Sequence, residues 1–233
     1  MIFGGWGIGR RKGWTNPYVT NGLVAMWDAE WNAGGGKHDS TGGLVEIISG
    51  TSTYIRRGSY VVDSDCLKCD AVVIASPSIP AIVDMAGGDI TIEGVCTRTA
   101  RGITFGGNRP FSADNTAGFY WSNSDYYMVH GGLTDSAFSS KWASGFKTDE
   151  RRARTLTASS DTVQWWLNGV ADTSSPRTKE LMTSTNPFSI FGWDWDFGFP
   201  ESGEFCTVRI YSRALSQEEI SFNYSIDKER FGL

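Results

Sequence analysis

The chain has 233 residues and a formal net charge of −5, with 28 glycines, 40% hydrophobic residues and 13% aromatic residues. Single all-β sandwiches commonly reach this length, so one domain preceded by a short arm accounts for the whole chain. The acidic balance argues against an electrostatic nucleic-acid binder, because such proteins need a clustered basic surface and Arg10–Lys12 is too short to supply one. Apolar runs stop well before the ~18 residues of a transmembrane span, and Met1–Gly9 lacks the pattern of a signal peptide.

The first segment, Met1–Thr20, is rich in glycine and carries Trp6, Trp14 and Tyr18. It is too irregular for a strand or helix and too aromatic for a plain linker. We therefore predict an arm over residues 1–20 and a single folded domain over residues 21–233. Two destinations for the arm stay open, its own domain and a neighbouring subunit.

Short segments rich in β-branched and aromatic residues follow, with turn residues between them, which indicates a sandwich of strands. Expected strands in the first half are Gly22–Asn32, Leu44–Ile48, Ser52–Arg56, Tyr60–Asp63, Ala71–Ala75 and Asp89–Thr97, with a loop at Pro77 and Pro80. Those in the second half are Ile103–Phe105, Gly118–Trp121, Tyr126–Val129, Arg152–Ala158, Thr162–Leu167, Val170–Thr173 and Phe188–Gly192. Asn168–Gly169 predicts a tight hairpin turn, because both residues tolerate positive φ.

The last strand leads directly into a helix. Cys206, Val208 and Ile210 alternate with polar or larger residues, the period of a half-buried strand. Ser216 and Glu219 then have the spacing of a capping box, with Leu215 and Ile220 placed as the hydrophobic staple. A strand is therefore expected to run into one short C-terminal helix.

This strand-to-helix passage and the ending Asn223–Phe231 resemble the close of laminin-G-like, concanavalin A-like jelly-roll domains. Gly22–Asn32, followed by His38–Ser40, resembles the opening strand and loop of the same family. The resemblance covers Asn21 to Leu233 and is carried by the two ends. It implies an all-β fold, a two-sheet antiparallel jelly-roll sandwich. Because lectins, adhesion modules, virion proteins and glycosidases share this sandwich, it implies the fold more firmly than the function.

Four cysteines are present, of which Cys66 and Cys69 form one C-x-x-C pair. A zinc ribbon needs a second close pair, which Cys96 and Cys206 do not provide. Cys96 and Cys206 are each expected to be small buried residues with free thiols. Whether Cys66 and Cys69 bond to each other depends on local geometry and stays open.

The loop Gly192–Glu204 gathers aromatic and acidic side chains, the mixture that sugar-binding sites use for stacking and for accepting hydroxyl hydrogen bonds. The predicted glycan contacts are Trp193, Asp194, Trp195, Asp196 and, from the opening loop, Trp31. Trp121 and Tyr126–Tyr127 are further candidate platforms. The alternative is that these aromatic residues seal the ends of the sandwich.

Asp194, Asp196 and Glu201 offer oxygen ligands for calcium, although their spacing matches no EF-hand loop. No other cofactor is expected. A retaining glycosidase needs two carboxyl groups ~5–5.5 Å apart, which glucanases of this fold place on one strand as Glu-x-Asp-x-(x)-Glu. Neither Asp28–Glu30 nor Asp194–Asp196 supplies that run, and His38 and His130 accompany no nucleophile motif. No catalytic residue is therefore predicted.

The favoured function is a non-enzymatic structural or adhesion protein of a virion. Family members are generally extracellular, and a phage protein released by lysis needs no signal peptide. The resemblance extends to accessory head-fibre, decoration or tail proteins of gut bacterial phages. It implies attachment to capsid or tail proteins through the arm, a homo-oligomer, a possible host surface glycan, and neither nucleic acid nor membrane as a partner. The alternative function is a glycan-processing enzyme, a glycoside hydrolase or lyase.

Overall fold

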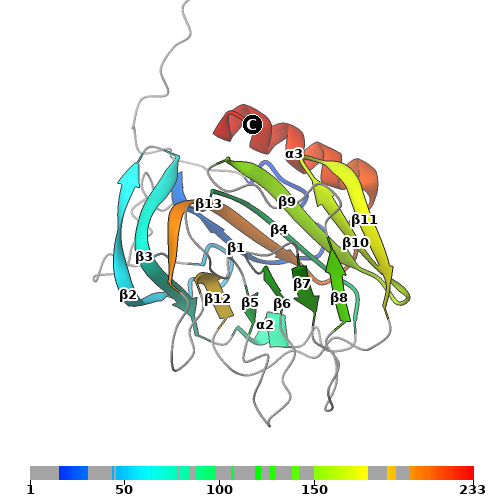
Figure 1. Cartoon of the computed structure of the whole chain (residues 1–233), viewed down its shortest axis with the longest axis horizontal. Coiled ribbons are helices and arrows are strands. Elements are labelled where there is room, and N and C mark those ends of the chain that lie inside the picture. The colour runs from blue at the N-terminus through cyan, green and yellow to red at the C-terminus, as the bar shows by residue number, and fades with distance from the viewer. Residues whose placement is uncertain are drawn as a thin grey trace, which may run out of the picture.

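The computed structural model describes residues 16–30, 44, 46–63, 65–77, 79–83, 88–97, 106–107, 119–121, 126–129, 138–141, 150–177, 188–192 and 200–233 (Figure 1). The elements in order are β1 (Leu23–Asp28), β2 (Tyr54–Asp63), β3 (Cys66–Ser76), α2 (Pro80–Val83), β4 (Ile90–Cys96), β5 (Gly106–Gly107), β6 (Phe119–Trp121), β7 (Tyr126–Val129), β8 (Phe138–Lys141), β9 (Arg152–Ala158), β10 (Thr162–Leu167), β11 (Val170–Pro176), β12 (Phe188–Phe191), β13 (Glu201–Tyr211) and α3 (Gln217–Phe231).

Within the described residues the strands form two antiparallel sheets, which contact each other at their ends. The larger sheet has the order β11-β10-β9-β4-β13-β3-β12-β5, with β1 paired to β13 and β2 to β3, and the smaller is β6-β7-β8. Contacts join β5 to β6 at one end of the small sheet and β8 to β11 at the other. The predicted antiparallel β fold with a C-terminal helix is therefore confirmed.

Several local predictions are confirmed with the same bounds, namely β7, β9 and β10. Asn168 and Gly169 form the expected turn, with φ of 50° and 74°. The prediction of a strand over Leu44–Ile48 is wrong, because the Glu46 carboxylate accepts hydrogen bonds from the backbone N–H groups of Met26 and Ile48 and fixes a turn there. Ile103–Phe105 lies outside the described residues.

β13 pairs with three other strands among the described residues. Its first half pairs with β3, from Glu201 opposite Val72 to Phe205 opposite Leu67. Its second half pairs with β4 on one edge and with β1 on the other. The two ends of the chain, which carried the family resemblance, therefore meet in one ladder.

A bulge in β13 corrects one prediction. Phe205 lies opposite Cys96 and Thr207 opposite Val95, so Cys206 is an extra residue that turns to the other face of the sheet. Phe205 packs in the main core with Val208 and Ile210, whereas Cys206 packs in a separate cluster. The prediction that Cys206 shares a face with Val208 and Ile210 is wrong for this reason.

The bulge also brings Cys206 to its partner. Cys206 forms a disulfide with Cys66, 140 residues earlier on the neighbouring strand β3. The expected free thiol at Cys206 is therefore wrong, and Cys66 and Cys69 do not bond to each other. Cys69 and Cys96 are buried thiols that take no part in this disulfide, as predicted for Cys96.

The main core lies between the sheets and includes the fully buried Trp27 and Trp165. Burying one large apolar side chain contributes about 1.5–3 kcal/mol, so this cluster is the main stabilising element of the sandwich. Phe191 of β12 and Phe205 of β13 meet edge to face, with ring centroids 6.1 Å apart. This contact connects β12 and β13, the two strands that pair with different parts of β3.

The larger sheet bends where β2, β3 and β13 are irregular at one level. Gly58 and Ala71 have φ of 64° and 46° and lie at neighbouring register shifts of β2 and β3. The N–H of Ala71 donates to the hydroxyl of Ser202, 2.9 Å away on β13. Beyond this bend β3 pairs with β12 rather than β13, which carries the sheet round into the second layer.

α3 begins at the predicted capping box. The N–H of Glu219 donates to the Ser216 hydroxyl at 3.3 Å, and the N–H of Ser216 donates to the Glu219 carboxylate at 2.9 Å. Leu215 and Ile220 pack in one apolar cluster, so the staple is confirmed as well. Within the described chain, no helix is both long and apolar enough to cross a membrane.

Candidate functional site

The predicted glycan contacts Trp31, Trp193, Asp194, Trp195 and Asp196 all lie outside the described residues, as do His38 and His130. The glycan site therefore stays a prediction. The described part of the chain contains no group of three His, Cys, Asp or Glu side chains arranged for a metal ion.

Glu201 is the one predicted calcium ligand that the structure describes. It opens β13 and is fully buried. Burial, followed by the charge of Glu201, raises the pKa of the neighbouring Cys69 thiol to about 12. Glu201 therefore turns toward the core, and its role as a ligand stays a prediction.

The outer face of β4, β9 and β13 carries the most developed polar site among the described residues. Alternation predicted a half-buried strand around Cys206–Ile210, yet this part of β13 is buried on both faces, as are β4 and β9. Their polar face lies under α3, which turns Ile220, Asn223, Asp227 and Phe231 toward the sheet (Figure 1). Buried polar groups need partners, and the two layers supply them to each other.

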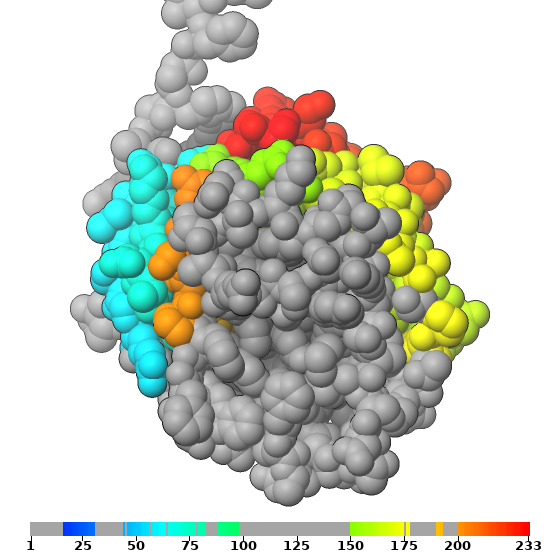
Figure 2. Space-filling view, viewed as in Figure 1, coloured from blue at the N-terminus to red at the C-terminus, as the bar shows by residue number. Residues whose placement is uncertain are grey.

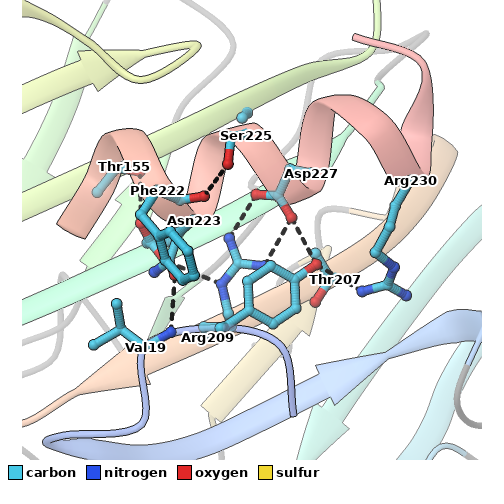
Figure 3. A network of polar contacts seen from close by, with 12 residues as sticks. Val19, Thr155, Thr207, Arg209, Phe222, Asn223, Ser225, Asp227 and Arg230 are labelled. Carbon is cyan, nitrogen blue, oxygen red and sulfur yellow. Dashed lines mark hydrogen bonds and ion pairs between the residues drawn. The ribbon is translucent and has the colours of Figure 1, made fainter. Parts of the chain in front are cut away.

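Arg209 of β13 is the centre of this network (Figure 3). Its Nη1 and Nη2 donate to the two carboxylate oxygens of Asp227, at 2.9 and 2.6 Å, and its Nε donates to Glu93 at 3.0 Å. The two-pronged pairing with Asp227 is the geometry that a guanidinium makes best with a carboxylate. One buried cation therefore joins β13 to both β4 and α3.

Both the nitrogen and the oxygen of the Asn223 side-chain amide on α3 form hydrogen bonds. Its Nδ2 donates to Glu93 at 2.7 Å and to the Tyr211 hydroxyl at 3.0 Å. Its Oδ1 accepts from the N–H of Val19 at 3.0 Å. The amide thus links the helix, the sheet and the segment that precedes β1.

Tyr18 ties that segment down. Its hydroxyl donates to Asp227 at 2.8 Å and accepts from Nη1 of Arg230 at 2.6 Å. The guanidinium of Arg209 lies over its ring, 3.8 Å from the centroid, in a desolvated cation–π contact. Tyr18, which the sequence placed in the arm, is therefore bound to the sandwich of its own chain.

Arg230 closes the network at the end of β1. It donates to both oxygens of the buried Asp28, at 2.9 and 3.0 Å, and to Glu30 at 2.8 Å. The acid pair Asp28–Glu30, weighed above for catalysis, is thus held by a single guanidinium. Both carboxylates therefore tie the end of β1 to α3.

The electrostatics of the network follow from burial. Loss of water raises the pKa of Glu93, an effect that Arg209 only partly offsets. For Arg209, burial alone would lower the pKa, but Asp227 and Glu93 raise it well above its usual value, so the cation is retained. Burial, followed by the charge of Asp227, raises the pKa of the Tyr18 hydroxyl.

A second, partly exposed cluster lies at the C-terminal end of α3. Arg151 donates to Glu204 at 3.1 and 2.9 Å, to Asp65 at 2.9 Å and to the carbonyl of Phe231 at 2.8 Å. It therefore connects the end of the helix to β13 and to the β2–β3 turn. Both clusters fasten α3 to the sheet.

Sequence reasoning missed this network, because it joins residues up to 212 positions apart. One signal was available, since Asn223 and Asp227 lie between Ile220 and Phe231 on one helical stripe. A polar pair in a buried stripe requires polar partners on the facing strand. Arg209, flanked by Val208 and Ile210, is the strand residue that fits.

A profile of the concanavalin A-like lectin/glucanases superfamily, Laminin_G_3, matches residues 81–221, which is more than half of the 233 residues. The chain belongs to this family. No curated protein sequence matches it.

Solved structures show the same fold at low sequence identity. Domain 4 of AbnA, a GH43 extracellular arabinanase from Geobacillus stearothermophilus, in complex with arabinotriose, is 15% identical with a TM-score of 0.55, over 85% of this chain and 96% of that one. Trypanosoma rangeli sialidase reaches 14% and 0.61, over 95% of this chain but 35% of its own. The binding domain of Paraclostridial Mosquitocidal Protein 1 reaches 12% and 0.60, over 87% and 52%. This chain therefore spans about a third of the sialidase and about half of the Mosquitocidal Protein 1 binding domain.

Proposed function

We propose that this protein is a non-enzymatic, virion-associated structural and adhesion protein, a head fibre, capsid decoration or tail accessory, that binds a host surface glycan weakly. The observation that carries the proposal is membership of this family, together with the structural use of buried carboxylates in this chain. Among the described residues, Asp28, Glu93 and Asp227 are buried and bound to arginines. Acids used in this way stabilise a display scaffold.

The comparisons support a binding role by analogy of fold. The arabinanase domain, in complex with arabinotriose, has nearly the same extent as this chain. The similar domain of Paraclostridial Mosquitocidal Protein 1 is a binding domain. In this chain the contacts would come from Trp193, Asp194, Trp195, Asp196 and Trp31, with Asp194, Asp196 and Glu201 as ligands if calcium is bound.

The disulfide supports a location outside the reducing cytosol. Cys66–Cys206 is the kind of bond that forms and persists in oxidising surroundings. The particle or extracellular surface of the proposal meets that condition. Since residues 16–20 include the bound Tyr18 and Val19, the segment proposed to attach to capsid or tail proteins is residues 1–15. Deleting only 1–15 spares the anchor, so lost incorporation into the particle would report on attachment and not on unfolding.

Glycan binding is tested on an array, with the protein displayed on streptavidin beads and, separately, as free protein. One aromatic contact contributes about 0.5–1.5 kcal/mol, so free protein should bind weakly and displayed copies should bind well. Trp193→Ala and Trp195→Ala should each weaken binding by roughly 2- to 12-fold. Phe222→Ala is the matched control, because Phe222 is an exposed aromatic residue on α3.

Two outcomes would reject the proposal. Glycan release by the purified protein, lost in Asp194→Asn or Glu201→Gln, would establish the glycan-processing enzyme instead. Absence of binding by displayed copies would remove the adhesion role and leave a decoration that contacts protein alone.

A further inference from the structure

The Cys66–Cys206 disulfide lies in a cluster that the C-terminal end of α3 completes. Both cysteines are almost fully buried, with exposed fractions of 1% and 0%. On the sheet they share an apolar cluster with Val95 of β4 and Ala153 of β9. The other members of this cluster all come from the last ten residues of the chain: Tyr224, Phe231 and Leu233. The covering that the structure describes over the disulfide is therefore the end of α3.

Phe231 is the fully buried member of that covering, with 2% of its surface exposed. The helix stops just after it, because Gly232 has a φ of 67° and donates its N–H to the carbonyl of Lys228 at 3.1 Å. Figure 2 shows this end of the chain, in red, at the surface of the molecule beside the green start of β9. A single surface turn thus places an aromatic ring in the cluster of the disulfide.

Two arginines fasten this turn. Arg151, just before β9, donates from Nη1 to the carbonyl of Phe231 at 2.8 Å and to Asp65, the neighbour of Cys66, at 2.9 Å. The guanidinium of Arg230 lies over the Phe231 ring, 4.7 Å from its centroid, and binds the acidic residues at the end of β1. The covering turn is therefore held from the sheet as well as by its own packing.

The last turn is also the part of α3 that can open with the least disruption. Arg151 is 25% exposed in its ion pairs, and pairs of this kind contribute little to stability. One turn earlier, Asp227 is held by the fully buried Arg209, which keeps the body of the helix on the sheet. Local opening of weakly held segments is far less costly than global unfolding.

We propose that the last turn of α3 gates thiol–disulfide exchange at Cys66–Cys206. A thiolate must reach a sulfur atom of the bond, so the docked turn blocks exchange and the lifted turn permits it. With a dithiol as reductant, one thiolate attacks a sulfur of the bond and releases the other as a thiolate. The second thiol of the reagent then displaces the mixed disulfide, so the protein gains two electrons and the reagent leaves as its own disulfide. This inference does not depend on the proposed function.

The rate of reduction in the folded, full-length protein tests the gate. Dithiothreitol is added in native buffer, new thiols are trapped with iodoacetamide, and the peptides of Cys66 and Cys206 are quantified by mass spectrometry. Arg151→Ala should raise the initial rate by roughly 5- to 30-fold, the effect of one to two lost contacts on an opening equilibrium. Arg177→Ala is the matched control, because Arg177 also donates to a backbone carbonyl, that of Ser159, at the end of β11. An unchanged rate in Arg151→Ala, or the same acceleration in both variants, would overturn the inference.

The urea dependence of the wild-type rate gives a second result, which decides even if a variant does not fold. Lifting one turn exposes little surface, so the rate should rise by less than ~3-fold per molar urea. Passage through the unfolded state would raise it by roughly 5- to 150-fold per molar. The steep dependence would refute the gate, because the bond would then be reached only by unfolding. A native rate equal to that of the urea-unfolded protein would refute it as well, because the disulfide would then have no effective cover.

Discussion

The buried network under α3 makes a quantitative prediction at Asp227. Asp227→Asn keeps the shape of the side chain, so it opens no cavity, but it removes the charge that receives two hydrogen bonds from Arg209 and one from Tyr18. Its new NH₂ group would also face donors. Breaking a buried ion pair by removing one partner costs about 3–5 kcal/mol. For a chain of this size that corresponds to a fall in melting temperature of roughly 6–20 °C.

Urea unfolding, followed by far-UV circular dichroism, measures this cost as a lower midpoint with an unchanged slope. Glu30→Gln is the matched control, because Glu30 is 46% exposed in its ion pair with Arg230. Exposed pairs contribute about 0–1 kcal/mol, so this variant should stay close to the wild type. If Asp227→Asn were no more destabilising than Glu30→Gln, the network would not hold α3 and the reasoning would be refuted.

Three further outcomes follow from the structure. Cys66→Ser opens a disulfide that closes a span of 140 residues and should lower the free energy of unfolding by about 4–5 kcal/mol in urea titrations; an unchanged midpoint would contradict the bond. Gly58→Ala should destabilise far more than Gly50→Ala in thermal melts, because both glycines have positive φ but only at Gly58 would a Cβ collide with backbone carbonyls; equal losses would argue against the bend. Burial and the charge of Asp227 raise the pKa of Tyr18, so the stability this hydroxyl contributes is complete below its unfolded pKa of about 10 and is lost as pH rises through the folded value. Absorbance at 295 nm should therefore show Tyr18 ionising together with unfolding, and Tyr18→Phe should remove that component; ionisation of Tyr18 in the folded protein near pH 10 would contradict its burial.

Local sequence signals predicted the local structure well. The passage from β13 into α3 was predicted correctly because a capping box and a hydrophobic staple depend on residues at most a few positions apart. β9, β10 and the Asn168–Gly169 turn were predicted for the same reason. Helix caps, short strands and hairpin turns are predictable because each depends on residues that are close together in the sequence.

Long-range pairing could not be predicted in this way. The partner of Cys206 depends on a bulge that reverses one side chain, and a one-residue change of register moves a side chain to the other face. The strand around Cys206–Ile210 was predicted to be half-buried, because alternation does not reveal whether a helix covers the polar face of a strand. Tyr18 and Asp227, 209 residues apart, meet only once the whole sheet has formed. The glycan contacts around Trp193 and Trp195 stay a prediction, since the structure does not describe them.

The central claim, binding without cleavage, is tested most directly by one size-exclusion experiment with light-scattering detection. A host cell-wall or capsular polysaccharide is incubated with the full-length protein displayed on streptavidin, and the molar mass of the polymer and the elution of the protein are measured together. The proposal predicts that the protein elutes with the polymer and that the polymer keeps its molar mass. A progressive fall in polymer mass would contradict it and identify an enzyme.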